Sequence, residues 1–220
     1  MRESENLSSR NKGFEEILEK TLEMRGISAK WIPFDQLHRF YTLLIKWQKT
    51  INLTAIKDPD EIADRHFAES LFILPRISRR GQLLDIGSGN GFPALPIKIA
   101  FPELKLVMVE GRKRKCHFLN AAVRELGLKD VEIINCRLNR LSDIAWGERF
   151  DYLTMRGVRV SADMLIDFPS ILKKNGRAFI YAGRSDLSVL DQPELTVKLR
   201  HEEFLLPGRR SSFVSVIEIA

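Results

Sequence analysis

A glycine-rich turn follows an apolar segment near the middle of the chain, in the sequence Leu83-Leu84-Asp85-Ile86-Gly87-Ser88-Gly89-Asn90-Gly91-Phe92-Pro93. Glycines at these positions allow the backbone to approach a ligand where a side chain would block it. A second apolar segment, 104–109, is followed at once by Glu110. In α/β proteins a carboxylate at the tip of the second strand accepts hydrogen bonds from ribose hydroxyls. The pattern therefore predicts a site for a nucleoside ligand.

The spacing of the glycines is G-x-G-x-G, and Phe92 stands where a dinucleotide-binding fold has its third glycine. This spacing favours S-adenosylmethionine, which has no pyrophosphate to seat on a helix N-terminus. A tight turn without a ligand is the alternative, and the acid at Glu110 argues against it. The predicted cofactor-binding residues in this region are Asp85, Gly87, Gly89, Gly91, Phe92 and Glu110.

The elements that must position these residues follow an alternating pattern. Strands are expected at 82–87, 105–110, 131–136, 150–156, 177–182, 197–206 and 212–219, and helices at 93–100, 112–127 and 161–174. Alternation of this kind predicts parallel βαβ units, and a turn at 207–210 makes the last two strands an antiparallel hairpin. The predicted class is α/β, a Rossmann-like methyltransferase fold with a mostly parallel seven-stranded sheet.

An N-terminal helical cap is expected ahead of this sheet, with residues 1–75 forming the cap and residues 76–220 the cofactor-binding domain. Apolar residues recur at helical spacing in 13–24, in a helix that opens at Pro33, and in a third that runs from Asp58 to Pro75. Pro33 and Pro93 are each expected near the first position of a helix. The polar residues 1–12 are expected to be frayed.

Positive charge is concentrated in the predicted cofactor-binding domain. The chain carries a net charge of +6, with −1 in residues 1–75 and +7 in residues 76–220. Basic residues open the helix after Glu110, where cations oppose the helix dipole, so phosphate contact is the predicted purpose. A solvated, solubilising surface is the alternative. The predicted RNA-binding residues are Arg79, Arg80, Arg112, Lys113, Arg114, Lys115 and Arg159. Arginines of the sheet-end loops are expected to form one electrostatic field around the site: Arg76, Arg79, Arg80, Arg137, Arg140, Arg156 and Arg159.

Several classes of protein are disfavoured by what the sequence lacks. Two cysteines and four scattered histidines predict neither disulfides nor a metal site, and a cytoplasmic protein without membrane segments is expected. Met155-Arg156-Gly157 stands where exocyclic-amine methyltransferases carry an Asp/Asn-Pro-Pro-aromatic motif, and no cysteine nucleophile follows that strand. An acceptor that needs no general base remains, and guanine N7 fits because its lone pair is free at neutral pH.

Three segments together resemble the signatures of one family: 47–54, 65–71 and 85–96. The family is that of the bacterial 16S ribosomal RNA guanine-N7 methyltransferases, also called glucose-inhibited division protein B, and the likeness runs from about residue 35 to the C-terminus. The resemblance implies cofactor contacts at Gly87, Phe92, Leu138, Asn139 and Arg156. It implies a site edge at Arg137 and a cap–cleft boundary at Asn52, His66 and Glu69. The predicted catalytic residues are Arg156, His66 and Arg137.

The sequence departs from that family at several positions: Glu69 for Asp, Ala94 for Gly, Asn139 for Glu, Gly157 for Ala and Ala182 for Lys. The predicted function is methyl transfer from S-adenosylmethionine to guanine N7 of 16S rRNA by a monomer. Methylation of another RNA site or a small molecule, and binding of cofactor and RNA without catalysis, remain alternatives. A nicotinamide-dependent dehydrogenase is a third alternative. A buried, hydrogen-bonded structural role is the alternative for His66.

Overall fold

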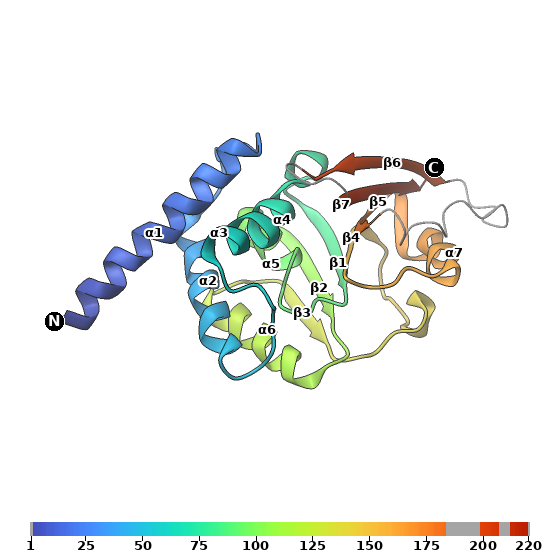
Figure 1. The fold of residues 1–220 in the computed structure, drawn as a ribbon. Helices are drawn as coiled ribbons and strands as arrows, with labels where there is room; N and C mark the ends of the chain where they lie inside the picture. The colour runs from blue at the N-terminus through green and yellow to red at the C-terminus, as the bar shows by residue number, and fades with distance from the viewer. Residues whose placement is uncertain (1, 184–198, 207–211, 220) are drawn as a thin grey trace.

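The computed structural model describes residues 2–183, 199–206 and 212–219, which form a seven-stranded sheet with helices on both faces (Figure 1). The strand order is β3-β2-β1-β4-β5-β7-β6. The strands are β1 Gly81–Ile86, β2 Leu104–Val109, β3 Val131–Ile134, β4 Phe150–Arg156, β5 Leu172–Gly183, β6 Leu199–Leu205 and β7 Ser212–Ile219. Strands β1 to β5 pair in parallel, and β7 pairs antiparallel with both β5 and β6. The predicted mixed sheet is confirmed, whereas the turn at 207–210 lies outside the described residues.

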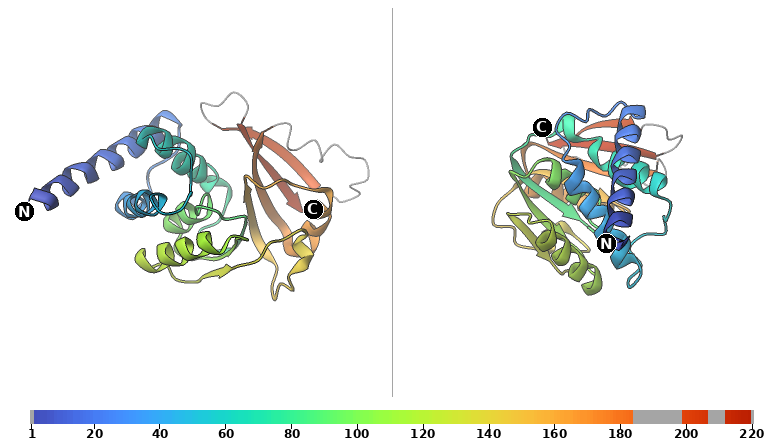
Figure 2. Two further views of the ribbon diagram at one scale, coloured as in Figure 1. Left: turned by 60° about the horizontal axis from the view of Figure 1, so that its bottom comes forward. Right: turned by 90° about the vertical axis from the view of Figure 1, so that its left-hand side faces the viewer.

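The two faces of the sheet carry separate hydrophobic clusters because side chains alternate along each strand. Leu83 faces the cluster that contains α5 (Ala94–Ala100) and α6 (Lys113–Glu125). Its neighbour Leu84 faces the cluster that contains α7 (Ala162–Ile171). The left-hand view of Figure 2 shows α5, α6 and the N-terminal helices on one side of the sheet and α7 on the other.

The N-terminal helices pack against the α5–α6 side of the sheet. They begin with α1 (Arg2–Met24) and α2 (Phe34–Gln48), and Phe40 of α2 lies within ring-contact distance of Phe118 of α6. These helices and one face of the sheet share a single hydrophobic cluster. α1 begins at Arg2 and projects away from the body (Figure 1), and fraying of residues 1–12 stays a prediction. A domain boundary at residue 75 stays a prediction.

The third N-terminal helix is divided rather than continuous. It consists of α3 (Pro59–Ile62), a π-helical turn (Ala63–Ala68), α4 (Glu69–Leu71) and a final 3₁₀ turn (Leu74–Arg76). Asp58 caps the start, since its side chain accepts hydrogen bonds from the backbone N–H groups of Asp60 and Glu61. The sequence predicted one helix here, and the π turn inserts an extra residue into it where Arg65 and His66 lie.

Other element ends differ from expectation by a few residues. Pro33 and Pro93 each lie one position before their helix rather than inside it, and the Phe92–Pro93 peptide bond is cis. The helix expected to reach residue 174 ends at Ile171, because β5 begins at Leu172. No helix in the described part of the chain is long and apolar enough to cross a membrane.

Candidate active site

A cavity of about 410 Å³ opens at the carboxyl ends of β1, β2 and β4. This is the switch point of the sheet, since the chain passes from β1 to β2 and β3 on one side and returns to β4 on the other. Ligands of α/β proteins bind at such a point, and the volume suits a small organic ligand. The cavity is lined by His66, Gly87, Ser88, Gly89, Asn90, Phe92, Glu110, Arg112, Lys115, Arg156, Gly157 and Val158.

The glycine turn forms one wall of this cavity in a conformation that only glycine adopts without strain. Gly87 has φ +73°, and a Cβ there would lie 2.3 Å from Cγ2 of Val158. Gly91 has φ +86°, and its Cβ would lie 2.5 Å from Cδ1 of Leu95. The predicted requirement for glycine is therefore explained by both backbone angle and space at these two positions. A side chain at either one would displace its neighbours.

Glu110 joins the turn after β1 to the turn after β2. The side chain is buried, and its Oε2 accepts a hydrogen bond from the backbone N–H of Gly89 at 2.8 Å. Its Oε1 accepts from the backbone N–H of Arg112 at 2.7 Å. A carboxylate oxygen has a second lone pair, so both oxygens keep capacity for a ligand's hydroxyls. The position fits the predicted ribose contact.

Asp85 lies beneath the cavity rather than in its wall. Its buried Oδ1 accepts a hydrogen bond from the Thr154 hydroxyl at 2.6 Å, which ties β1 to β4. Burial raises the pKa of Asp85 to about 6, against the opposing effect of its hydrogen bonds. This carboxyl therefore supports the floor of the site from within the sheet.

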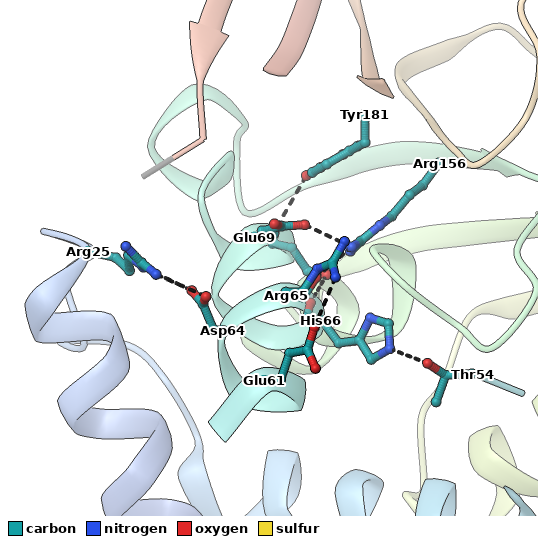
Figure 3. Close-up of polar contacts among 10 residues, drawn as sticks. Arg25, Thr54, Glu61, Asp64, Arg65, His66, Glu69, Arg156 and Tyr181 are labelled. Carbon is teal, nitrogen blue, oxygen red and sulfur yellow. Dashed lines mark hydrogen bonds and ion pairs between the residues drawn. The ribbon is translucent and has the colours of Figure 1, made fainter. Parts of the chain in front are cut away.

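Arg156 links the end of β4 to the π-helical turn of the N-terminal region (Figure 3). Its Nη2 donates to Oε2 of Glu69 at 2.8 Å and to the carbonyl oxygen of Arg65 at 2.5 Å. Its guanidinium lies 5.8 Å from the ring centre of Tyr181, whose hydroxyl donates to the Ser70 carbonyl at 3.5 Å. Burial raises the pKa of Tyr181, so the phenol stays neutral. Glu69, predicted at the boundary between cap and cleft, thus forms a direct ion pair with Arg156.

His66 lines the cavity from the same π turn. Its ring stacks on Phe92 with centroids 4.7 Å apart and planes at 18°, and Nε2 lies 2.9 Å from the Thr54 hydroxyl. Burial, followed by the charges of Arg156 and Arg65, lowers the pKa of His66 to about 3. The imidazole is therefore neutral at pH 7. It is both a buried hydrogen-bonding residue and a wall of the cavity.

The predicted residues after β3 lie outside the cavity wall. Arg137 is exposed, and its Cβ would lie 3.3 Å from a Cβ at Gly111. Leu138 packs against the α7-side cluster. Asn139 uses its backbone N–H to reach Asp143 at 3.0 Å. The structure therefore brings none of these three to the lining, although Arg137 stands beside the turn that follows Glu110.

The predicted basic residues separate into two groups. Arg112 and Lys115 line the cavity. Lys113, Arg114 and Arg159 are exposed, the first two in the opening turn of α6 and the third in the loop after β4. They follow β2 and β4, so they lie on the cavity's side of the sheet.

Arg79 and Arg80 lie at the opposite end of the strands from the cavity. They precede β1, whose six residues span about 20 Å. Arg80 pairs there with Glu103 at 2.5 Å. The expectation that these two arginines share one electrostatic field with the site is wrong, because loops before and after a strand lie at opposite ends of it.

Five contributors to the site were missed by reasoning from sequence: Ser88, Asn90, Thr54, Gly157 and Val158. Ser88 and Asn90 lie between the predicted glycines, so the turn itself was a sufficient signal. Val158 follows β4, and a sheet in which β4 adjoins β1 brings that loop to the glycine turn. Thr54 reaches His66 only through the packing of the N-terminal helices, for which the sequence offers no spacing rule.

Known proteins resemble this chain in sequence and in fold. A sequence model of the family described as rRNA small subunit methyltransferase G (GidB) matches residues 34–205. A relative of that name from Caldanaerobacter subterraneus subsp. tengcongensis is 33% identical over 184 residues, covering 79% of this chain and 77% of the relative. Another, from Geobacter sp. strain M21, is 35% identical over 170 residues, covering 77% of this chain and 78% of the relative.

Among solved structures, a SAM-dependent methyltransferase from Aquifex aeolicus aligns with a TM-score of 0.57 at 15% identity, covering 80% of this chain and 98% of that one. A methyltransferase from Pyrococcus furiosus aligns with a TM-score of 0.56 at 13% identity, covering 84% of this chain and 97% of that one. These two alignments establish the methyltransferase fold, while the family match covers most of the sequence. The chain belongs to the rRNA small subunit methyltransferase G family.

Proposed function

We propose that this protein transfers a methyl group from S-adenosylmethionine to N7 of a guanine in the 16S RNA of the small ribosomal subunit. One observation carries the proposal: in a chain of this family, the cavity at the β1–β4 switch point combines the Gly87 turn, Glu110 and Arg156. The proposed partner is the small subunit or its RNA, and the proposed compartment is the cytoplasm, where that RNA is found. A monomer without metal remains our prediction.

The cofactor site is assigned to the glycine turn and Glu110. S-adenosylmethionine supplies an electrophilic methyl group on a sulfonium. Gly87 and Gly89 provide bare backbone against which the ligand packs, and the free lone pairs of Glu110 accept from ribose hydroxyls. Phe92 stays in place beneath the ligand because His66 stacks on it. The roles proposed for Leu138 and Asn139 are contacts made through their backbone at the rim.

The acceptor follows from the acid–base properties of the cavity. Among the described residues that line it, Arg112, Lys115 and Arg156 are cations, and His66 is a very weak base with a pKa of about 3. The lining carboxylate of Glu110 already accepts from two backbone N–H groups and is assigned to the ribose. Such a wall is poorly suited to removing a proton from an acceptor. Guanine N7 attacks with a lone pair and loses no proton, so positioning and exclusion of water suffice for the transfer. Arg156, held by Glu69, is proposed to position the base, with Arg137 at the entrance.

The entrance of the cavity suits an RNA backbone. Arg112 and Lys115 reach the cavity, and the exposed Lys113, Arg114 and Arg159 extend the same positive surface outward. Cations placed this way neutralise phosphates and make affinity fall with salt. A small-molecule methyltransferase would have no use for this surface.

A transfer assay tests the proposal. Purified protein is incubated with methyl-labelled S-adenosylmethionine and small subunits from cells that lack the enzyme, with Glu110→Ala as the matched site variant. Label in 16S RNA that the variant fails to deposit is the expected result. Cofactor binding without label in RNA would overturn the proposal in favour of a binding protein or another acceptor.

A further inference from the structure

A second group of cations and aromatic rings lies at the amino-terminal ends of the strands, opposite the cavity. We call it the far-edge cluster, and its members are Lys30, Trp31, Arg79, Arg80 and Phe101. Trp31, in the connection between α1 and α2, is 56% exposed, which is unusual for so large an apolar side chain. Arg79 and Arg80 precede β1, and Phe101 follows α5.

Arg79 is held by rings rather than by a carboxylate. Its guanidinium lies 4.7 Å from the Trp31 ring centre and 5.6 Å from that of Phe101, and Phe101 is itself buried. Arg79 makes no ion pair with any residue that the structure describes, whereas Arg80 pairs with Glu103. A guanidinium that rests over a ring keeps the N–H donors of its own plane available, and they can bind a phosphate in bidentate fashion.

Lys30 adds a second cation to the same ring, with its ammonium nitrogen 5.1 Å from the Trp31 centroid. Two basic side chains from distant segments of sequence thus meet at one exposed aromatic residue, and Arg80, next to Arg79 in sequence, pairs with the carboxylate of Glu103. A guanidinium fixed by aromatic rings beside a lysine is a combination by which proteins bind nucleic-acid phosphates. An acidic protein segment would also be attracted, but it has no need for the planar, bidentate donor.

We propose that the far-edge cluster is a second RNA-binding surface, which holds phosphates of a part of the folded rRNA separate from the methylated nucleotide. The inference rests on the proposed function, since it takes the same RNA as the partner. β1 separates the cluster from the cavity by about 20 Å, so a five-nucleotide RNA centred on the target guanine, which extends roughly 7 Å to either side at about 3.4 Å per nucleotide, does not reach both. The cluster therefore contributes affinity for a large folded substrate and leaves the methyl-transfer step alone.

Three variants test this surface: Arg79→Gln removes the held charge, Trp31→Leu removes the ring beneath it, and Lys20→Gln is the control. Lys20 is exposed on α1, and its replacement changes the net charge as Arg79→Gln does. Binding to small subunits and to a five-nucleotide RNA centred on the target guanine is measured by filter retention between about 50 and 200 mM salt. Melting temperature and cofactor affinity are measured as checks on folding and on the catalytic site.

The proposal expects Arg79→Gln to weaken small-subunit binding about three- to tenfold and to reduce the salt slope by about 1. Trp31→Leu should weaken it less, and both variants should leave the short RNA, the cofactor affinity and kcat unchanged. Unchanged subunit binding in Arg79→Gln, or an equal loss in Lys20→Gln, would overturn the proposal. If Arg79→Gln instead lost binding to ribosomal proteins freed of RNA and kept its binding to the RNA, the surface would be assigned to a protein partner. These readouts are of binding, so they stand apart from whether the wild-type protein methylates.

Discussion

Replacing Gly87 with alanine measures how tightly the cofactor turn is built. Two separate costs apply, because Gly87 has φ +73° and because a Cβ there would lie 2.3 Å from Cγ2 of Val158. The left-handed conformation costs a non-glycine residue roughly 1–2 kcal/mol. Forcing an extra methyl group into a packed site costs about 1–3 kcal/mol more. Gly87→Ala should therefore lower the free energy of unfolding by about 2–5 kcal/mol.

Gly157 is the matched control in the same cavity wall. It also has positive φ, +65°, but a Cβ there would meet nothing within 4 Å. Gly157→Ala should show only the backbone cost, roughly 1–2 kcal/mol. The difference between the two variants isolates the collision with Val158.

A second change provides the rescue. Val158→Ala removes Cγ2 and leaves Cβ at 3.8 Å, an ordinary contact distance from the new methyl group. In the double variant, urea unfolding should therefore recover about 1–3 kcal/mol relative to the sum of the single changes. If the stability losses of the two single variants simply add in the double variant, the collision with Val158 is not what excludes a side chain at Gly87. Calorimetry on the same proteins should show that Gly87→Ala also loses cofactor affinity, and normal affinity there would contradict the site assignment.

The remaining predictions concern the residues that surround Arg156. Glu69→Gln keeps the shape but replaces the ion pair with a hydrogen bond from the Arg156 guanidinium to a neutral amide oxygen, so stability should fall by about 1 kcal/mol, and kcat should drop while cofactor affinity is retained. Glu69→Asp, which keeps the charge, should recover part of kcat; equal activity in all three proteins would contradict a positioning role. His66 titrates near 3 when folded and near 6.5 when unfolded, so the unfolded state binds more protons between these values and stability is lost as pH falls from about 6.5 to 3. His66→Asn should flatten that part of a melting-temperature profile, and an unchanged profile would exclude His66 as its source.

The glycine turn and the alternation of strands and helices were predictable because both are properties of short segments. Three glycines, an apolar strand before them and an acid after the next strand are enough to predict the turn and the place of Glu110. The hairpin was predictable because β6 and β7 are adjacent in sequence without a helix between them. What the sequence did not indicate is that β7 enters between β5 and β6, which depends on the packing of the whole sheet edge.

The contacts between distant segments were harder to predict. The π turn at 63–68 leaves no mark in the apolar spacing, yet it carries the Arg65 carbonyl and His66 to Arg156 and Phe92. The low pKa of His66 likewise depends on burial and on two arginines, which no local pattern indicates. The wrong prediction for Arg79 and Arg80 had a simpler cause. Both residues precede β1, so the direction of that strand alone places them at the end opposite the cavity.

One measurement tests the central claim directly: mapping the methylated position in 16S RNA after reaction with this protein. The RNA is treated with reagents that cleave the chain at N7-methylguanine, and fragments are located by primer extension. The account predicts a single new cleavage site at one guanine, which disappears when Arg156→Ala replaces the wild-type protein. Label in the RNA without cleavage at any guanine would contradict N7 as the acceptor.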